Sequence, residues 1–220
     1  HFADMDADIA DLRKAYAHDR AEYTALAEKL HQSRLALGEA FSQRLIAELA
    51  DMAMEAVRFD VQFERFAGDA SGTDTCLFMI APNPGMPLRP LYDIASGGEM
   101  SRIMLAIKTI LSGAGGIETL IFDEIDTGIG GLVLTTVADK LEALGQHEQV
   151  ICVTHAPSIA ARGDRNFFIE KQAVNDLTET HVALLDSEDA LVREIARMSG
   201  GTDPWQLEAA ARLRAQKHFH

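Results

Sequence analysis

The spacing of apolar residues predicts a long helical stretch at the N-terminal end of the chain. From about residue 8 to 56 proline is absent and Gly38 is the only glycine. Apolar residues recur there at intervals of three, four or seven: Tyr23, Leu26, Leu30, Leu37, Phe41, Leu45, Leu49 and Met52. This is the pattern of an apolar stripe on a helix, and about 48 helical residues would extend roughly 70 Å. The pattern predicts either one extended helix that packs against a partner helix, or two ordinary helices broken near Gly38.

The next segment reads as a pair of strands. Residues 57–66, "VRFDVQFERF", alternate between apolar and polar side chains, which is typical of a half-exposed strand. The turn-rich "AGDASGTD" and the apolar "TCLFMI" follow. Together these segments predict an antiparallel hairpin, and the Pro/Gly-rich "APNPGMPLRPL" after it predicts a loop.

From about residue 97 onward, helical patterns alternate with short apolar strands. Strands are expected at 119–122 and 150–154 and in "NFFIEK" and "HVALLD"; helices are expected at about 97–112, 132–144, after Pro157, at 188–198 and at 204–216. Short apolar strands between helices are typical of a parallel sheet that is buried on both faces. The predicted fold class is therefore α/β, with a parallel sheet flanked by helices.

The composition limits the classes of protein to which the chain can belong. The chain has 220 residues, 47% hydrophobic and 25% charged, which is typical of a globular domain, and it contains no apolar run of the roughly 20 residues that span a bilayer. Its N-terminal residues do not have the pattern of a signal peptide. Because the chain begins without methionine, we expect a fragment or a processed product. The net charge of −14 argues against a surface that attracts nucleic acid by bulk electrostatics. We expect Cys76 and Cys152 to be buried free thiols in a reducing cytosol.

Three segments carry candidate chemistry, and the first is "SGGE" at residues 96–99, directly before the apolar residues of a helix. Two adjacent glycines at a helix start leave backbone N–H groups unshielded, which suits an anion. A plain turn would use the same glycines for their φ freedom. This segment alone leaves both interpretations open.

The second and third segments place polar residues at the ends of two apolar strands. In "TLIFDEIDTGIGG", Asp123 and Glu124 end a strand at the carboxyl edge where open α/β sheets bind ligands. Asp123 could hold a metal-bound water while Glu124 faces a reacting group, and these two roles suit a site that binds magnesium and phosphate. The alternative is that both acids simply lie at a solvated strand end. In "VICVTHAP", Thr154 and His155 reach the same edge, where a neutral histidine can donate to a phosphate or orient a water; the alternative is a loop residue.

The order and spacing of these segments resemble the C-terminal half of an ABC-type ATPase head: signature motif, Walker B, D-loop and switch histidine, over roughly residues 90–170. The segments "EMSRIMLAIKTIL", "DEIDTGIGG", "CVTHAP" and "EIARMSGG" further resemble the RecN family, SMC-like bacterial ATPases of DNA double-strand-break repair. The resemblance implies the cofactors ATP and Mg²⁺.

The resemblance also implies roles for seven residues. Contact with the γ-phosphate of ATP held by the opposite subunit would come from Ser96, Gly97 and Gly98, with Glu99 closing the motif. Asp123 would support Mg²⁺, Glu124 would polarise the attacking water, and His155 would sense the γ-phosphate. These parts suit phosphoryl transfer.

Two positions depart from the ABC pattern. Ala95 stands where the signature motif usually has leucine, and Gly130 stands where many ABC proteins carry the D-loop aspartate. The D-loop role is therefore not transferred to Gly130, and Asp126 is only a candidate substitute.

The resemblance implies a division into residues 1–56, the returning arm of an antiparallel coiled coil, and residues 57–220, the C-terminal lobe of the head. A phosphate-binding loop needs Gly-Lys, and no lysine here follows a glycine. The first implied partner is therefore the N-terminal half of its own head, which would carry the phosphate-binding Walker A motif. The other implied partners are a second head in a homodimer and DNA ends, which the full assembly would bind. A membrane is not among the expected partners. The complete protein would be a cytoplasmic, nucleoid-associated ATPase, and this chain alone would be inactive. The alternatives are another SMC-like or RecF-like head, against which "DTGIGG" argues, and a non-catalytic coiled-coil scaffold.

Overall fold

A computed structural model describes residues 2–94, 96–111, 119–174 and 177–217. The chain divides into two compact units, residues 1–47 with 56–93 and residues 48–55 with 94–220. The three strands between residues 58 and 90 group with the first helix in the first unit, whereas the predicted division places them with the lobe. That division of the complete protein stays a prediction.

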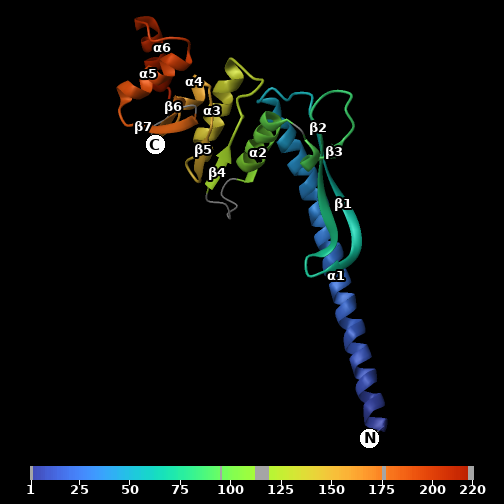
Figure 1. Cartoon of the computed structure of the whole chain (residues 1–220). Coiled ribbons are helices and arrows are strands. Elements are labelled where there is room, and N and C mark those ends of the chain that lie inside the picture. The colour runs from blue at the N-terminus through green and yellow to red at the C-terminus, as the bar shows by residue number, and fades with distance from the viewer. Residues whose placement is uncertain (1, 95, 112–118, 175–176, 218–220) are drawn as a thin grey trace. The chain divides into compact units, whose positions relative to one another are not determined.

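The first helix, α1 (Phe2–Ala50), is continuous, so the single long helix is the correct alternative (Figure 1). Gly38 does not interrupt it. A Cβ on Gly38 would lie 3.1 Å from the ring of Phe63 and 3.3 Å from Cβ of Val61. The glycine therefore allows a strand to approach α1 closely.

Two long strands lie alongside the second half of α1 (Figure 1). β1 (Arg58–Asp69) and β2 (Gly72–Ala81) form the predicted antiparallel hairpin, with β3 (Arg89–Pro90) on the free edge of β2 and a 3-10 turn at Leu91–Asp93. The aromatic rings of Phe41, Phe59 and Phe78 pack together with centroids 5.4–6.0 Å apart. This cluster joins the hairpin to α1, and rings at these separations stabilise each other beyond the area that they bury.

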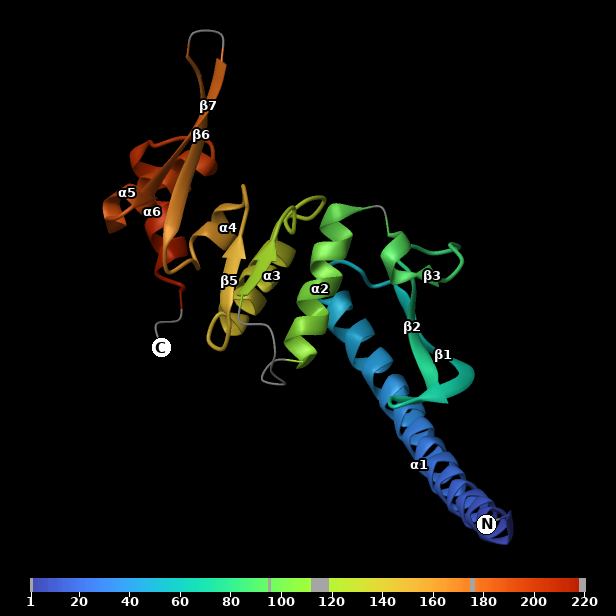
Figure 2. The same ribbon diagram turned by 60° about the horizontal axis from the view of Figure 1, so that its bottom comes forward.

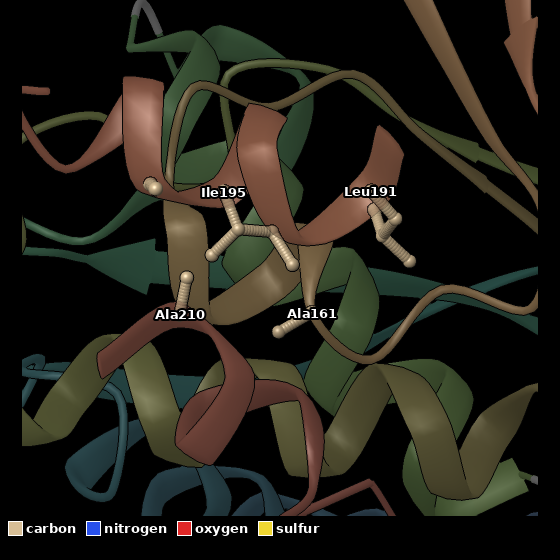
Figure 3. Close-up of a cluster of buried hydrophobic side chains, with 5 residues drawn as sticks. Ala161, Leu191, Ile195 and Ala210 are labelled. Atoms are coloured by element: carbon tan, nitrogen blue, oxygen red, sulfur yellow. The ribbon is translucent and has the colours of Figure 1, made fainter. Parts of the chain in front are cut away.

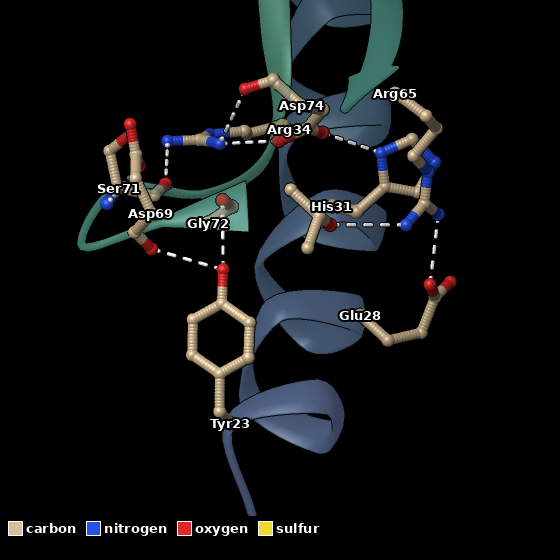
Figure 4. Close-up of polar contacts among 10 residues, drawn as sticks. Tyr23, Glu28, His31, Arg34, Arg65, Asp69, Ser71, Gly72 and Asp74 are labelled. Carbon is tan, nitrogen blue, oxygen red and sulfur yellow. Dashed lines mark hydrogen bonds and ion pairs between the residues drawn. The ribbon is translucent and has the colours of Figure 1, made fainter. Parts of the chain in front are cut away.

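Polar contacts add to the packing of the hairpin on α1 (Figure 4). Nδ1 of His31 lies 2.5 Å from Oδ2 of Asp74, while Arg34 pairs with the other oxygen of the same carboxylate. The hydroxyl of Tyr23 donates to two main-chain carbonyls at the hairpin turn, each at 3.0 Å. The hydrogen bond from His31, followed by the bond and charge of Arg34, lowers the pKa of Asp74.

The second unit contains a pair of parallel strands, β4 (Thr119–Phe122) and β5 (Gln149–Cys152), in register from Thr119↔Gln149 to Phe122↔Cys152 (Figure 2). The helices around them are α2 (Gly97–Leu111), α3 (Leu132–Leu144) and α4 (Pro157–Ala160). These elements match the predicted order. Because both strands run the same way, their carboxyl ends lie at one edge.

The two faces of this parallel pair differ in burial. Leu120 and Phe122 are buried in the core of the unit, whereas Ile121 is 70% exposed and Ile151 and Val153 are also exposed. The expectation of a sheet buried on both faces is therefore wrong for the part of the chain that the structure describes. The described elements supply a core for one face only.

The C-terminal part of this unit adds a hairpin and two helices: β6 (Asn166–Val174), β7 (Leu177–Leu185), α5 (Glu188–Met198) and α6 (Pro204–Arg214). Figure 3 shows the buried cluster in which α5 meets α6, formed by Ala161, Leu191, Ile195 and Ala210 together with Ala196. Small residues on one side let the helices approach closely. The cluster anchors the end of the chain to the segment that follows α4.

The cysteines differ from expectation in burial. Both are free, but Cys76 is exposed and Cys152 is half-buried. The prediction of burial is therefore wrong for Cys76. Among the described residues, no helix is long and apolar enough to cross a bilayer.

Candidate nucleotide site

The carboxyl ends of β4 and β5 bring the two acids and the histidine to one edge of the sheet. Asp123 and Glu124 directly follow β4, and both side chains are exposed. The N–H of Val153 donates to the carbonyl of Phe122 at 2.9 Å, so the strand pairing continues up to this edge. His155 follows two residues later, and its side chain is 82% exposed. The sequence-predicted acids and histidine therefore share one edge, as expected from parallel strands.

Glu124 has an unusual backbone conformation. Its φ is +57°, in the left-handed region that costs an L-residue on the order of 1 kcal/mol. The N–H of Thr127 donates to the carbonyl of Glu124 at 3.0 Å and closes a turn. This turn ends β4 abruptly and directs the chain from the two acids toward Asp126.

The start of α2 lies against this turn. A Cβ on Gly98 would lie 2.9 Å from the carbonyl oxygen of Glu124 and 3.2 Å from that of Thr127. A Cβ on Gly97 would overlap the carboxylate of Glu124. Neither glycine has a positive φ, so close approach rather than conformational freedom requires glycine here. The structure therefore brings the Ser-Gly-Gly segment together with the acid that follows β4.

Ser96 and Glu99 complete the exposed start of α2. The carbonyl of Ser96 accepts the first helical hydrogen bond, from Met100 at 3.0 Å, and its Oγ accepts a long one from the N–H of Glu99 at 3.4 Å. Ser96 and Gly97 are exposed, and Glu99 is half-buried. The helix start thus presents backbone N–H groups to solvent at the same edge as the acids, which suits an anion. The departure at Ala95 lies outside the described residues.

Two side chains of α2 hold this helix to the loop after β4, and sequence reasoning did not assign them a role. The hydroxyl of Ser101 donates to the carbonyl of Asp123 at 2.6 Å. Arg102 is buried, and its Nη1 donates to the carbonyls of Ile125 and Thr127 at 3.3 and 2.9 Å. Burial lowers the pKa of Arg102. The signal in the sequence was an arginine among the apolar residues of "SRIMLAI".

Asp126 connects the loop after β4 to the loop after β5. Its side chain is buried, and one oxygen, Oδ2, accepts three hydrogen bonds: from the hydroxyl of Thr154 at 2.5 Å and from the N–H groups of His155 and Ala156 at 2.9 and 3.0 Å. Nδ1 of His155 lies 3.3 Å from the same oxygen. Asp126 thus fixes the backbone of His155 while the imidazole stays exposed. Sequence reasoning considered Asp126 only as a D-loop substitute and missed this contact.

The thiol beneath this edge is inert. Cys152 ends β5, and burial, followed by the charges of Asp126 and Asp123, raises its pKa to about 12. At neutral pH the thiolate is essentially unpopulated. The polar groups that this edge offers to a ligand are therefore carboxylates, backbone N–H groups and an imidazole.

The fold has a solved counterpart. The crystal structure of the Smc head domain with a coiled coil and joint, derived from Pyrococcus yayanosii, aligns with 88% of this chain and 36% of that one, with a TM-score of 0.55 and 15% identity. The chain therefore shares the fold of part of an Smc head domain. No family model matches the chain.

Sequence relatives identify the family. The chain is 42% identical over 189 residues to the DNA repair protein RecN of Treponema pallidum, a match that covers 80% of this chain and 33% of that protein. It is 38% identical over 200 residues to RecN of Xylella fastidiosa, covering 90% and 36%, and 34% identical over 229 residues to RecN of Synechocystis, covering 97% and 39%. The chain belongs to the RecN family, and it spans little more than a third of the length of the curated relatives that it matches.

Proposed function

We propose that this chain is the C-terminal portion of an ATP-hydrolysing head of a RecN-type protein that acts in DNA double-strand-break repair and recombination. The observation that carries the proposal is the meeting, at one sheet edge, of the Gly97–Gly98 helix start, the acids after β4 and the histidine after β5. Phosphoryl transfer needs positioned charges and donors of this kind more than it needs covalent chemistry.

The exposed start of α2 would bind phosphate. Ser96 offers a hydroxyl, and the N–H groups at the helix N-terminus favour negative charge. We propose that Ser96, Gly97 and Gly98 contact the γ-phosphate of ATP held by a second head, with Glu99 closing the motif. In this structure the Glu124 carboxylate lies against Gly97, so it would have to turn away when a phosphate enters.

Mg²⁺ fits the acids of this edge. A triphosphate brought next to Asp123 and Glu124 would meet like charge, which a divalent cation neutralises. The described residues contain no cluster of three metal-ligating side chains. This suits Mg²⁺, which binds one or two carboxylates and takes its remaining ligands from phosphates and water. Asp123, exposed directly after β4, is the residue that would hold it.

Glu124 and His155 would act on the reacting groups. Both side chains are exposed while their backbones are fixed, Glu124 by the turn to Thr127 and His155 by Asp126. We propose that Glu124 polarises the attacking water and that His155 senses the γ-phosphate. Their side chains can reach a ligand without any change in the loops that carry them.

The proposed N-terminal half of the head would cover the exposed face of β4 and β5. Ile121, Ile151 and Val153 lie on that face, and parallel sheets are normally covered on both sides. The same half would supply the phosphate-binding loop that this sequence lacks. We therefore propose that the chain by itself does not hydrolyse ATP, and that the complete protein pairs two heads and engages DNA ends at the nucleoid.

The test is Glu124→Gln in the complete protein, with Glu39→Gln on exposed α1 as the matched control. We expect Glu124→Gln to lower ATP turnover at least 100-fold, since it removes a group that polarises water, and to accumulate an ATP-bound dimer in size-exclusion chromatography. The Glu39→Gln protein should keep the wild-type rate. Unchanged turnover would contradict the role of Glu124, and a wild-type complete protein without ATPase activity would favour the scaffold.

A further inference from the structure

The imidazole of His155 faces the buried carboxylate of Asp126 through one of its two ring nitrogens. Nδ1 of His155 lies 3.3 Å from Oδ2 of Asp126, whose side chain is 2% exposed, whereas the side chain of His155 is 82% exposed. The other ring nitrogen, Nε2, lies on a different side of the ring from Nδ1. The exposed ring therefore has one nitrogen next to a buried acid and one that can meet a ligand.

The oxygen that faces Nδ1 can only accept hydrogen bonds. Oδ2 of Asp126 already accepts from the hydroxyl of Thr154 and from the N–H groups of His155 and Ala156, at 2.5 to 3.0 Å. An oxygen that accepts three hydrogen bonds carries no proton, so it presents negative charge to Nδ1. That charge would repel a lone pair on Nδ1, whereas it attracts an N–H at the same place. The carboxylate therefore favours the form of the ring in which Nδ1 carries the proton.

The three donors do not by themselves require a charged residue at position 126. A neutral amide oxygen would accept the same hydrogen bonds, and a buried carboxylate is costly. Its second oxygen, Oδ1, is buried and has no hydrogen-bond partner among the described residues. The charge nevertheless acts on its surroundings, because it is the next cause after burial that raises the pKa of Cys152. A charge that is kept at this cost points to a use, and Nδ1 of His155 is a neighbour that gains from it.

We infer that Asp126 is a positioning residue that holds the proton of His155 on Nδ1 and thereby makes Nε2 the nitrogen that meets the terminal phosphate of ATP. What His155 meets rests on the proposed function, whereas the position of its proton does not. In the neutral ring Nε2 then has a lone pair and accepts from a water that bridges to the phosphate. Once the ring takes up a second proton, Nε2 donates to a phosphate oxygen directly. Asp126 is buried and acts through His155 without touching the nucleotide itself.

The position of the proton can be measured on this chain without nucleotide. The measurement is ¹⁵N NMR of the histidine side chains at about pH 8.5, well above the ordinary histidine pKa of about 6.5. Protonated and unprotonated ring nitrogens have well-separated ¹⁵N shifts, and the signals of His155 are those missing from the spectrum of His155→Gln. We expect Nδ1 to be the protonated nitrogen in the wild-type chain. In Asp126→Asn, which keeps an acceptor and loses the charge, the ratio of the Nδ1–H form to the Nε2–H form should fall at least threefold.

The matched control is Asp186→Asn, the same substitution at an exposed acid of the same unit, which should leave this ratio unchanged. A wild-type ring with its proton on Nε2 would overturn the inference, whether or not Asp126→Asn folds. An unchanged ratio in Asp126→Asn, or an equal fall in Asp186→Asn, would also overturn it. Unchanged signals of His147, in the same unit, check that the Asp126→Asn chain is folded.

The route through His155 is tested in the complete protein by a double-mutant cycle with His155→Gln, with ATP turnover as the measured rate. We expect Asp126→Asn to lower turnover at least tenfold when His155 is present and less than twofold when it is already replaced. A loss by the same factor in both backgrounds would mean that Asp126 only holds the loop, and would overturn its role through His155. A wild-type complete protein without ATPase activity would contradict the proposed function and the phosphate contact, whereas the NMR measurement decides the position of the proton separately.

Discussion

Asp126 is the residue on which the geometry of the candidate site depends most. Its single oxygen Oδ2 accepts hydrogen bonds from Thr154, His155 and Ala156, and the side chain is only 2% exposed. Replacing it with alanine would leave the hydroxyl of Thr154 and the N–H of His155 without their acceptor, whereas the N–H of Ala156 also donates to the hydroxyl of Thr154 at 2.9 Å. The loop after β5 would then lose its connection to the loop after β4.

The cost follows from these contacts. A buried donor left unsatisfied costs about 1–3 kcal/mol, and hydrogen bonds to a carboxylate are about twice as strong as neutral ones. Part of this loss of stability is offset, because the substitution also removes the desolvation cost of a buried carboxylate. The other oxygen of that carboxylate, Oδ1, has no hydrogen-bond partner among the described residues. We therefore expect Asp126→Ala to lower the free energy of unfolding by about 3 kcal/mol. Asp126→Asn keeps an acceptor but loses the charge, so about half that loss is expected.

Urea unfolding of the second unit provides the assay. Trp205 is the only tryptophan of the chain and lies in α6 of this unit, so its fluorescence reports the relevant transition. Asp186→Ala is the matched control, because Asp186 is an exposed acid of the same unit, and it should change the unfolding free energy by no more than about 0.5 kcal/mol. A loss below about 1 kcal/mol for Asp126→Ala would refute the argument that its three contacts hold the loop.

Two further perturbations test the packing at the start of α2 and on α1. Gly98→Ala should lower the free energy of unfolding, measured in urea, by about 2 kcal/mol, because the new Cβ would lie 2.9 Å from the backbone oxygen of Glu124. Gly97→Ala should lower it by less than about 1 kcal/mol, because only the flexible side chain of Glu124 must move. Equal losses for the two variants would contradict this packing. The pKa of Asp74 is lower in the folded protein than in the unfolded chain, where it is about 3.9. The ionised carboxylate therefore stabilises the folded protein fully above the unfolded-state pKa. This stabilisation is lost as the pH falls through the lowered pKa of the folded state. The excess thermal midpoint of wild type over Asp74→Asn should therefore shrink below about pH 4, and a constant difference from pH 7 to pH 3 would contradict the assignment.

Periodicity predicted the elements of the second unit closely. The strand at 119–122 and the helices at 132–144 and 188–198 are observed at the predicted residues. The strand is a short apolar run, and each of the two helices has a clear apolar period bounded by glycine or serine. The shared edge of the sheet followed from parallel strands. These predictions needed only local patterns and one rule of topology.

What the sequence could not reveal depends on contacts between distant residues. Asp126 accepts from residues 28–30 positions away, and Arg102 donates to carbonyls 23 and 25 positions away, so no local spacing marks either of them. The exposed face of β4 is another example. An apolar strand predicts a covering layer, but not whether that layer comes from the same part of the chain.

The contacts that hold the candidate site together involve different side chains from those proposed to act on nucleotide. Ser101 and Arg102 bind backbone carbonyls of the loop after β4, and Asp126 binds backbone amides of the loop after β5. The side chains of Asp123 and His155 are left exposed. A substitution among the acting residues should therefore change chemistry while leaving the loops in place, whereas a substitution at Asp126 should displace them. Unfolding measurements can separate the two kinds of substitution. A substitution of a residue proposed to act on nucleotide should lower activity alone, whereas a substitution of Asp126 should lower both activity and the free energy of unfolding.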